Sequence, residues 1–436
     1  MAVSPAPEPL LAVHARRTPD ADALLAPGER LSWQALHARA AAAAGELAAR
    51  GVRPGDRVAI ELPAGIGFAV ALHACLLLGA AVLPVDGRLA ESERATRRRA
   101  AQHVVAREPE GAGPVSAADP KGLTPGAVVL AVHTSGTTSA PKLVELTWGN
   151  VEANALGSAL ALGFDRAERW LCPLPLTHVG GLMVLLRSLV YGTAAQLLPA
   201  PFDAAAANHA LMHEGVTLAS LVPTMLARML DAGLGHPPRL RAVLLGGAPS
   251  DPALLDRARA AGVPVAQTYG LTEACSQVCT SAPGEPETAG WPLPGLSVEL
   301  APDGEILVSG PTVAGGGTLH TGDLGRLDAR GRLTVIGRKS DTIVSGGENV
   351  APAEIEAVLL AHPAVADAGV FGRPDREWGE AIAARVVLRA GASARPEELQ
   401  AFCRERLARF KVPKAVELAH ELPRTSSGKL LRRELA

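Results

Sequence analysis

The sequence has little cysteine, almost no net charge and no recognisable leader. Its five cysteines are scattered and odd in number, which excludes a disulfide framework and is typical of a reducing compartment. Lys and Arg number 42 against 44 Asp and Glu, a formal net charge of −2. No basic excess therefore points to nucleic acid or an anionic membrane surface. The first residues lack the basic stretch and apolar core of a signal peptide, so we expect a cytoplasmic protein.

Long apolar runs are almost absent as well. One run, residues 67–85, is nearly long enough to cross a bilayer. It contains His73 and is interrupted by Gly79 and Pro84. These residues favour a buried helix that ends near Gly79, followed by a short buried strand, over a membrane span.

The composition that remains is that of a large globular protein. The chain has 436 residues, 48% of them hydrophobic, enough for two or three domains with sizeable cores. Predicted helices such as 33–50 and 181–191 alternate with short apolar strands, which predicts an α/β fold with mainly parallel sheets. After residue 296 hairpin patterns take over. We expect a large multi-layered N-terminal domain, 1–337, and a small α+β C-terminal domain, 338–436, with the boundary near 338–341.

A loop rich in small hydroxylated residues follows the predicted strand 127–133. It reads TSGTTSAPK, from Thr134 to Lys142. Hydroxyls and backbone N–H groups in such a loop can cradle an anion, and the lysine adds positive charge. It lacks the glycine and lysine spacing of a Walker A loop. By itself the loop fits a solvated turn equally well.

Four further motifs offer polar groups. YGLTE, which ends at Glu273, places a hydroxyl beside a carboxylate after a strand, as a phosphate and Mg²⁺ site needs. TGD, ending at Asp323, offers a carboxylate for the two hydroxyls of a ribose, although such a turn is common. The stretch 337–356, GRKSDTIVSGGENVAPAEIE, is far more specific, and PRTSSGK at 423–429 completes the set.

In this order and spacing the motifs resemble those of the acyl-adenylate-forming superfamily, which includes acyl-CoA ligases, firefly luciferases and peptide-synthetase adenylation domains. The resemblance covers residues 133 to 430. It implies a large domain with a small lid, and an enzyme that adenylates a carboxylic acid with ATP and Mg²⁺ and then transfers the acyl group to a thiol, commonly coenzyme A. The implied partners are these small molecules; no nucleic acid or membrane span is expected, and homo-oligomerisation is left open.

The resemblance also assigns roles to residues. The catalytic set it implies is Lys429, Glu273, Thr272 and Lys142, with Glu273 on the metal and Lys429 bridging substrate carboxylate and α-phosphate. The nucleotide and coenzyme A contacts it implies are Thr134, Ser135, Gly136, Thr137, Thr138, Gly246, Gly247, Ala248, Tyr269, Gly270, Asp323, Arg338, Gly346 and Gly347. Two positions depart from the family pattern: Ser139 stands where glycine is usual, and Ser340 stands at the hinge where an acidic or lysine side chain is common.

In the middle of the chain, the segments PLPLTHVGG (173–181), LMVLLRSLVYG (182–192), VPTML (222–226) and TEACSQV (272–278) resemble the o-succinylbenzoate–CoA ligase branch, an enzyme type of menaquinone biosynthesis. Arg187 interrupts an apolar helix, and a buried unpaired guanidinium is costly. A dicarboxylate needs a second contact that Arg187 could supply, although an arginine facing solvent or a structural acid fits as well. His178 could cover an aromatic ring, and Ser276 could add a polar contact. A ligase for another aryl or fatty acid, a module that loads a carrier protein, and an inactive homologue remain open alternatives.

Overall fold

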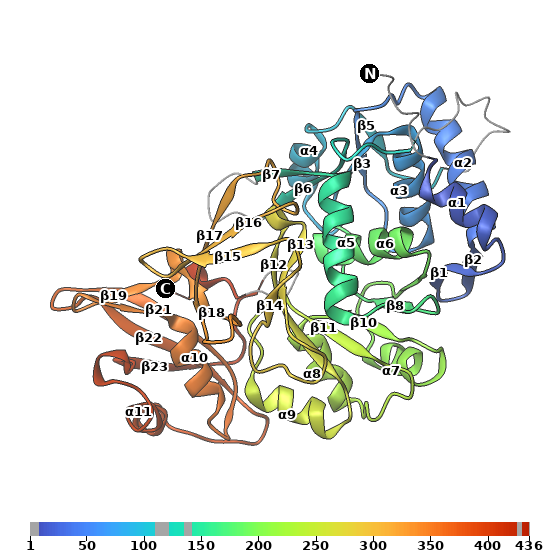
Figure 1. Cartoon of the computed structure of the whole chain (residues 1–436). Helices are drawn as coiled ribbons and strands as arrows, with labels where there is room; N and C mark the ends of the chain where they lie inside the picture. The colour runs from blue at the N-terminus through green and yellow to red at the C-terminus, as the bar shows by residue number, and fades with distance from the viewer. Residues whose placement is uncertain (1–7, 110–121, 135–141, 425–429, 436) are drawn as a thin grey trace. The chain divides into compact units, whose positions relative to one another are not determined.

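The computed structural model describes residues 8–109, 122–134, 142–424 and 430–435 (Figure 1). The chain divides into two compact units. Unit 1 comprises Met1–Gly246, Ala258–Ser297 and Val308–Leu319, and unit 2 comprises Gly247–Arg257, Val298–Leu307 and His320–Ala436. The expected α/β class, with a large N-terminal part and a smaller C-terminal part, is confirmed. The proposed boundary near 338–341 stays a prediction.

The first sheet of unit 1 is mainly parallel and has the strand order β14-β13-β12-β11-β10-β8-β9-β1-β2. From β12 to β9 each strand runs parallel to its neighbour. The carboxyl ends of these strands therefore meet at one edge of the sheet, where ligands of such folds bind. Its strands are β1 (Asp22–Ala26), β2 (Glu29–Ser32), β8 (Arg169–Cys172), β9 (Ala194–Leu197), β10 (Leu218–Leu221), β11 (Ala242–Leu245), β12 (Val265–Leu271), β13 (Ser276–Thr280) and β14 (Trp291–Pro292).

The second sheet of unit 1 has the order β5-β3-β4-β6-β7. Its strands are β3 (Arg57–Ile60), β4 (Ala81–Pro84), β5 (His103–Val105), β6 (Val128–Thr134) and β7 (Lys142–Thr147). Residues 103–127 are rich in Gly, Pro and charge, a composition that predicts a loop-rich crossing, but the first three form β5, which pairs in parallel with β3. The strand is only three residues long, too short for a period-2 pattern to be read from the sequence.

Helices alternate with these strands along the chain. They are α1 (Leu10–Arg17), α2 (Trp33–Ala49), α3 (Ile66–Leu78), α4 (Glu91–Arg98), α5 (Trp148–Leu162), α6 (Val179–Tyr191), α7 (Ala204–His213), α8 (Pro223–Asp231) and α9 (Pro252–Ala260). The long apolar run forms α3 and β4, as predicted. Gly79 ends α3 in the left-handed conformation at φ 67°, which glycine adopts without strain. In the described residues, no helix is long and apolar enough to span a membrane.

A smaller antiparallel sheet joins the hairpins expected after residue 296. It has the order β15-β16-β17-β18, and most of it belongs to unit 2. The strands are β15 (Ser297–Leu300), β16 (Glu305–Ser309), β17 (Thr318–Leu327) and β18 (Leu333–Arg338).

The rest of unit 2 is a sheet of the order β20-β19-β22-β21, with β23 beside β22. Its strands are β19 (Ile343–Ser345), β20 (Glu348–Val350), β21 (Val365–Asp375), β22 (Gly379–Leu388) and β23 (Ala415–Ala419), and its helices are α10 (Pro352–Leu360) and α11 (Pro396–Arg404). Ile355 and Leu359 of α10 and Leu399 of α11 are fully buried in the core of this unit. This part of the chain therefore has a hydrophobic core of its own.

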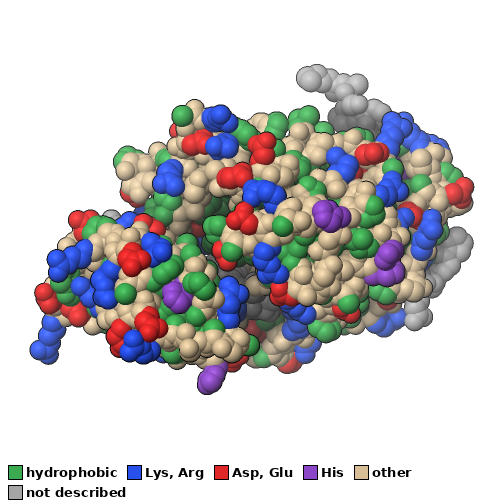
Figure 2. Space-filling model, turned by 90° about the horizontal axis from the view of Figure 1, so that it is seen from below, with side chains coloured by type: hydrophobic (Ala, Val, Ile, Leu, Met, Phe, Trp, Pro, Cys, Tyr) green, Lys and Arg blue, Asp and Glu red, His purple; other side chains and the backbone are tan. Residues whose placement is uncertain are grey.

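Charges of both signs are mixed on the surface drawn in Figure 2, where Lys and Arg lie among Asp and Glu. Many charged side chains of the described residues form ion pairs, such as Arg97 with Glu93 on α4 and Arg373 with Glu417 in unit 2. Mixed and paired charges give little long-range field of one sign. This surface matches the near-zero net charge of the sequence.

Candidate active site

The hydroxyl-rich loop connects two paired strands of unit 1. Thr134 ends β6 and Lys142 begins β7, and the two residues face each other as the last pair of the antiparallel ladder. The Thr134 hydroxyl donates to the Lys142 carbonyl oxygen at 3.4 Å. The predicted contacts Ser135, Gly136, Thr137 and Thr138, and the departure at Ser139, lie outside the described residues. The fold thus brings the two ends of the motif together at a hairpin.

The YGLTE motif lies at the carboxyl end of β12. Thr272 and Glu273 form the short helix η1 (Thr272–Ala274) between β12 and β13. Gly270 permits a close approach of the chain here, because a Cβ atom on it would lie 1.8 Å from the Ser276 carbonyl oxygen. Cys275 and Ser276 both have positive φ, 56° and 89°, which is unfavourable for residues with a side chain. The turn is therefore sharply folded immediately after the two predicted metal and phosphate residues.

A second loop lies at the same edge of this sheet, because β11 is the parallel neighbour of β12. It begins at Gly246, where a Cβ atom would come within 2.7 Å of the Thr268 side chain. Gly247 has φ 83°, and Gly247 and Ala248 are exposed. The backbone of this loop is therefore accessible, which the predicted contact with the adenine ring of a nucleotide requires.

Arg187 is the central residue of the predicted substrate group. It is on α6, 1% exposed, and its guanidinium lies 5.4 Å from the centre of the Trp170 ring. Its Nη2 donates to Oδ1 of Asn154 at 2.7 Å and to the Ser276 hydroxyl at 3.4 Å. The structure therefore brings Arg187 and Ser276 together, as the substrate hypothesis needs. Sequence reasoning missed Asn154, because nothing in the local sequence of α5 marks it.

His178 does not join this group. It precedes α6 with an extended backbone, φ −115° and ψ 148°, whereas Arg187 lies within the helix, nine residues further on. Its side chain is exposed, yet the protein packed around it lowers the pKa of His178, with Arg88 and Arg97 acting in the same direction and Asp86 opposing them. The structure gives His178 and Arg187 different surroundings, and the expected cover over an aromatic ring stays a prediction.

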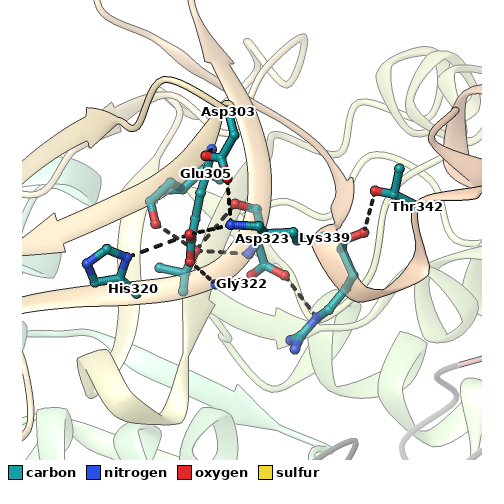
Figure 3. Close-up of polar contacts among 10 residues, drawn as sticks. Asp303, Glu305, His320, Gly322, Asp323, Lys339 and Thr342 are labelled. Atoms are coloured by element: carbon teal, nitrogen blue, oxygen red, sulfur yellow. Dashed lines mark hydrogen bonds and ion pairs between the residues drawn. The ribbon is translucent and has the colours of Figure 1, made fainter. Parts of the chain in front are cut away.

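In unit 2 the two predicted ribose contacts are neighbours. Asp323 of β17 and Arg338 of β18 are paired across the antiparallel ladder, and Nε of Arg338 lies 2.9 Å from Oδ1 of Asp323. Figure 3 shows Lys339, the next residue, beside two further carboxylates: its Nζ is 2.5 Å from Asp303 and 3.1 Å from Glu305. The Gly322 N–H also donates to Glu305, at 3.0 Å. Hydrogen bonds and ion pairs thus fix the strand ends around Asp323.

The two glycines of the SGGEN motif form the turn of a hairpin. Ser345 and Glu348 pair at the ends of β19 and β20, and Gly346 and Gly347 between them have φ 61° and 83°. A two-residue turn with positive φ at both positions strongly favours glycine. The Gly346 N–H donates to the Trp378 carbonyl at 2.8 Å. This geometry explains the glycines sterically, and their predicted coenzyme A contact stays a prediction.

Lys429 lies outside the described residues, but both flanks of its segment are described. Arg424 and Leu430 form an isolated antiparallel bridge, and the Leu431 N–H donates to the Pro423 carbonyl at 2.9 Å. Arg432, three residues after Lys429, pairs with Asp341 at 2.8 Å and with Glu356 at 2.6 Å. The residues on the two sides of the Lys429 segment therefore pair with each other, and Arg432 connects the second side to Asp341 and Glu356.

The described side chains suit a magnesium ion next to η1. Glu273 and Thr272 offer a carboxylate and a hydroxyl oxygen, the hard donors that Mg²⁺ prefers, and Glu273 forms no ion pair with any other described residue. In the part of the chain that is described, no three His, Cys, Asp or Glu side chains gather as a complete metal cage. Mg²⁺ usually keeps several waters and is completed by substrate phosphates. The oxygen atoms of Glu273 and Thr272 therefore fit a Mg²⁺ ion that binds together with a nucleotide.

The chain is similar to known proteins over most of its length. Residues 11–106 and 97–316 match the AMP-binding enzyme family, and residues 354–429 match the AMP-binding enzyme C-terminal domain. A 2-succinylbenzoate–CoA ligase of Bacillus cereus is 39% identical, with 96% of each chain covered.

Two solved structures are similar over nearly the whole chain. The o-succinylbenzoate CoA synthetase of Bacillus subtilis in complex with its acyl-adenylate intermediate has a TM-score of 0.90 and 36% identity, covering 99% of this chain and 98% of that one. The same protein in complex with ATP and a magnesium ion has a TM-score of 0.90 and 36% identity, covering 98% of each chain. The resemblance predicted from the five motifs is confirmed, and the chain belongs to the AMP-binding enzyme family.

Proposed function

We propose that the protein is an AMP-forming acid–CoA ligase that converts o-succinylbenzoate to o-succinylbenzoyl-CoA, a reaction of menaquinone biosynthesis. The observation that carries the choice of substrate is the buried Arg187, which has no carboxylate partner among the described residues. A cation held in this way suits a substrate with a second carboxylate. The similarity to 2-succinylbenzoate–CoA ligases at 39% identity supports the same choice.

The proposed reaction has two steps. A carboxylate oxygen of the acid attacks the α-phosphorus of ATP, the bond to the β-phosphate oxygen breaks, and pyrophosphate leaves. The thiol of coenzyme A then attacks the acyl carbon, loses its proton, and displaces AMP. Both steps bring anions together or build negative charge on oxygen, so positioned positive groups provide the main stabilisation.

This chain's own residues supply that stabilisation in the proposal. Lys142 and the loop 134–142 hold the phosphates, and Lys429 contacts the α-phosphate and the substrate carboxylate during adenylation. Glu273 and Thr272 hold Mg²⁺, which neutralises phosphate charge when bound. Asp323 binds the ribose hydroxyls, oriented by the ion pair with Arg338 at 2.9 Å. The loop of Gly246, Gly247 and Ala248 contacts the adenine ring, with Tyr269 and Gly270 next to the phosphates.

We also propose that the C-terminal domain starts at a hinge near residues 338–341. Lys339 is tied to Asp303 and Glu305, whereas Asp341, two residues later, is tied to Arg432. Ser340 is thus the residue between two anchored neighbours, which supports a hinge near 338–341 and a C-terminal domain that starts there. We place the reaction in the cytoplasm, in line with five buried cysteines without disulfide bonds.

The test is pyrophosphate release by the purified protein with Mg-ATP. We would offer o-succinylbenzoate, benzoate and a medium-chain fatty acid in parallel, each with and without coenzyme A. We expect turnover with o-succinylbenzoate and with neither of the other two acids. When coenzyme A is present, its thioester should form. Preference for a monocarboxylate would contradict the substrate assignment but keep the reaction class. Adenylation of o-succinylbenzoate without transfer to coenzyme A would instead identify a module that loads a carrier protein.

A further inference from the structure

Arg187 is surrounded by side chains from three other elements of unit 1. Asn154 contacts it from α5, Trp170 from β8 and Ser276 from β13. Both hydrogen bonds use Nη2, and Nε has no hydrogen-bond partner. Asn154 is 0% exposed, whereas Ser276 is partly exposed. Of the two side chains that accept from Arg187, Ser276 is therefore the more accessible one and Asn154 the fully buried one.

Among the described residues, no acidic side chain pairs with Arg187. No carboxylate of a described residue lies within ion-pair distance of it. The two groups whose ionised forms would attract it stay neutral, because burial raises the pKa of the Tyr191 hydroxyl and raises that of the Cys275 thiol to about 12. Burial likewise lowers the pKa of Arg187, although a guanidinium stays protonated at any ordinary pH. A buried, uncompensated cation is costly unless an anion arrives to pair with it.

Asn154 is held so that only its oxygen faces Arg187. Its Nδ2 donates to the Gln277 carbonyl at 3.0 Å, and its Oδ1 accepts from Arg187 at 2.7 Å. An amide satisfies one donor of the guanidinium without cancelling the charge. Aspartate has the same shape, but its carboxylate would pair with Arg187 internally and compete with any carboxylate of a ligand.

We propose that Asn154 is a positioning residue that determines specificity: it orients Arg187 and, being neutral, leaves the charge available for the second carboxylate of the acid. This inference rests on the proposed function. It predicts that the residue at position 154 affects the choice between a dicarboxylic acid and its monocarboxylic analogue more than it affects turnover in general.

The experiment measures kcat/KM for pyrophosphate release with o-succinylbenzoate and with two analogues that each lack one carboxylate, 4-oxo-4-phenylbutanoate and 2-butanoylbenzoate. The discrimination ratio is kcat/KM for o-succinylbenzoate divided by that for the better analogue. We expect Asn154→Asp to lower this ratio at least tenfold, mainly through KM for o-succinylbenzoate. Asn154→Ala, which removes the acceptor without adding charge, should lower the ratio by a smaller factor of about 3 to 10.

The control is Asn150→Asp, which adds the same charge to α5 one turn earlier. Asn150 donates to the Pro311 carbonyl and has no contact with Arg187, so its substitution should leave the ratio unchanged. If Asn154→Asp does not fold, the discrimination ratio of Asn154→Ala tests the inference by itself. An equal loss with all acids, or an unchanged ratio in a folded variant, would overturn the inference.

The wild-type protein by itself tests the proposed function, before any variant is measured. Wild-type protein that releases no pyrophosphate with o-succinylbenzoate contradicts the proposed substrate. Wild-type protein that turns it over, with variants that keep the ratio, contradicts only the role of Asn154.

Discussion

Asp323 and Arg338 are paired directly across β17 and β18, with Nε of Arg338 2.9 Å from Oδ1 of Asp323. The carboxylate is largely buried, with 8% of its side chain exposed, against 39% for the arginine. A largely buried carboxylate with a charged hydrogen-bond partner has a fixed orientation. The pairing links two residues that are 15 positions apart in the chain and that the family resemblance assigns to the same ribose.

Asp323→Asn should raise KM for ATP by about 10- to 100-fold, the usual effect of weakening a hydrogen bond to a charged group. The amide keeps the size of the side chain but loses half of its accepting capacity and its ion pair with Arg338. Initial rates of pyrophosphate release at varied ATP concentration measure the change. KM for the acid, determined at saturating ATP, serves as the internal control and should change by less than about threefold. A larger effect on the acid than on ATP would place Asp323 elsewhere in the site.

Lys429→Ala should separate the two half-reactions. The lysine is proposed to stabilise charge on the α-phosphate, and removing one such preorganised group slows a chemical step by roughly 10²–10³-fold. Pyrophosphate release should fall by that factor, whereas thioester formation from a synthetic acyl-adenylate and coenzyme A should stay close to the wild-type rate. Lys411, which is paired with Glu354 in unit 2, gives the control variant Lys411→Ala. An equal loss in both half-reactions would contradict the assignment of Lys429 to adenylation.

Much of the fold could be predicted because its signals are local. Apolar runs bounded by glycine and proline predicted α3 and β4, and Gly79 ends α3 as expected. The motif residues at the ends of β6, β11 and β12 were also visible, since polar side chains after buried strands mark the ligand edge of an α/β sheet.

What the sequence could not give are contacts between distant elements. The partner of Arg187 is Asn154, which is 33 residues away and on another helix, and no local pattern distinguishes it from other buried amides. The sequence predicts both His178 and Arg187 as substrate residues because their segment resembles one ligase branch and because Arg187 interrupts an apolar helix. The positive φ of Cys275 and Ser276 is likewise set by the close approach of β12 and β13.

Acid should destabilise the protein through His73. This residue of α3 is 2% exposed, and burial lowers its pKa from 6.5 to about 4. A histidine kept neutral by the fold contributes stability above pH 6.5, and that contribution is lost as pH falls toward 4, by up to about 3 kcal/mol in total. Urea unfolding at pH 7 and pH 5 measures the loss. In His73→Leu the free energy of unfolding should differ less between pH 7 and pH 5 than in the wild type. His209→Gln, at an exposed position, should leave this difference unchanged. If His73→Leu shows the same difference as the wild type, other groups cause the acid sensitivity.

The sharp turn after β12 should depend on Gly270 for steric reasons. A Cβ atom on this residue would lie 1.8 Å from the Ser276 carbonyl oxygen and 2.6 Å from its carbon, and these are backbone atoms that no rotamer change can move. Gly270→Ala must therefore displace β12 from β13, at a cost of about 1–3 kcal/mol in the free energy of unfolding. The displaced segment carries Thr272 and Glu273, so pyrophosphate release should fall by at least about tenfold even below the melting temperature, because small misplacements of such groups slow reactions strongly. Gly235→Ala is the matched control, since a Cβ atom there meets nothing within 4 Å. A Gly270→Ala protein with wild-type stability and activity would mean that the two strands do not approach so closely.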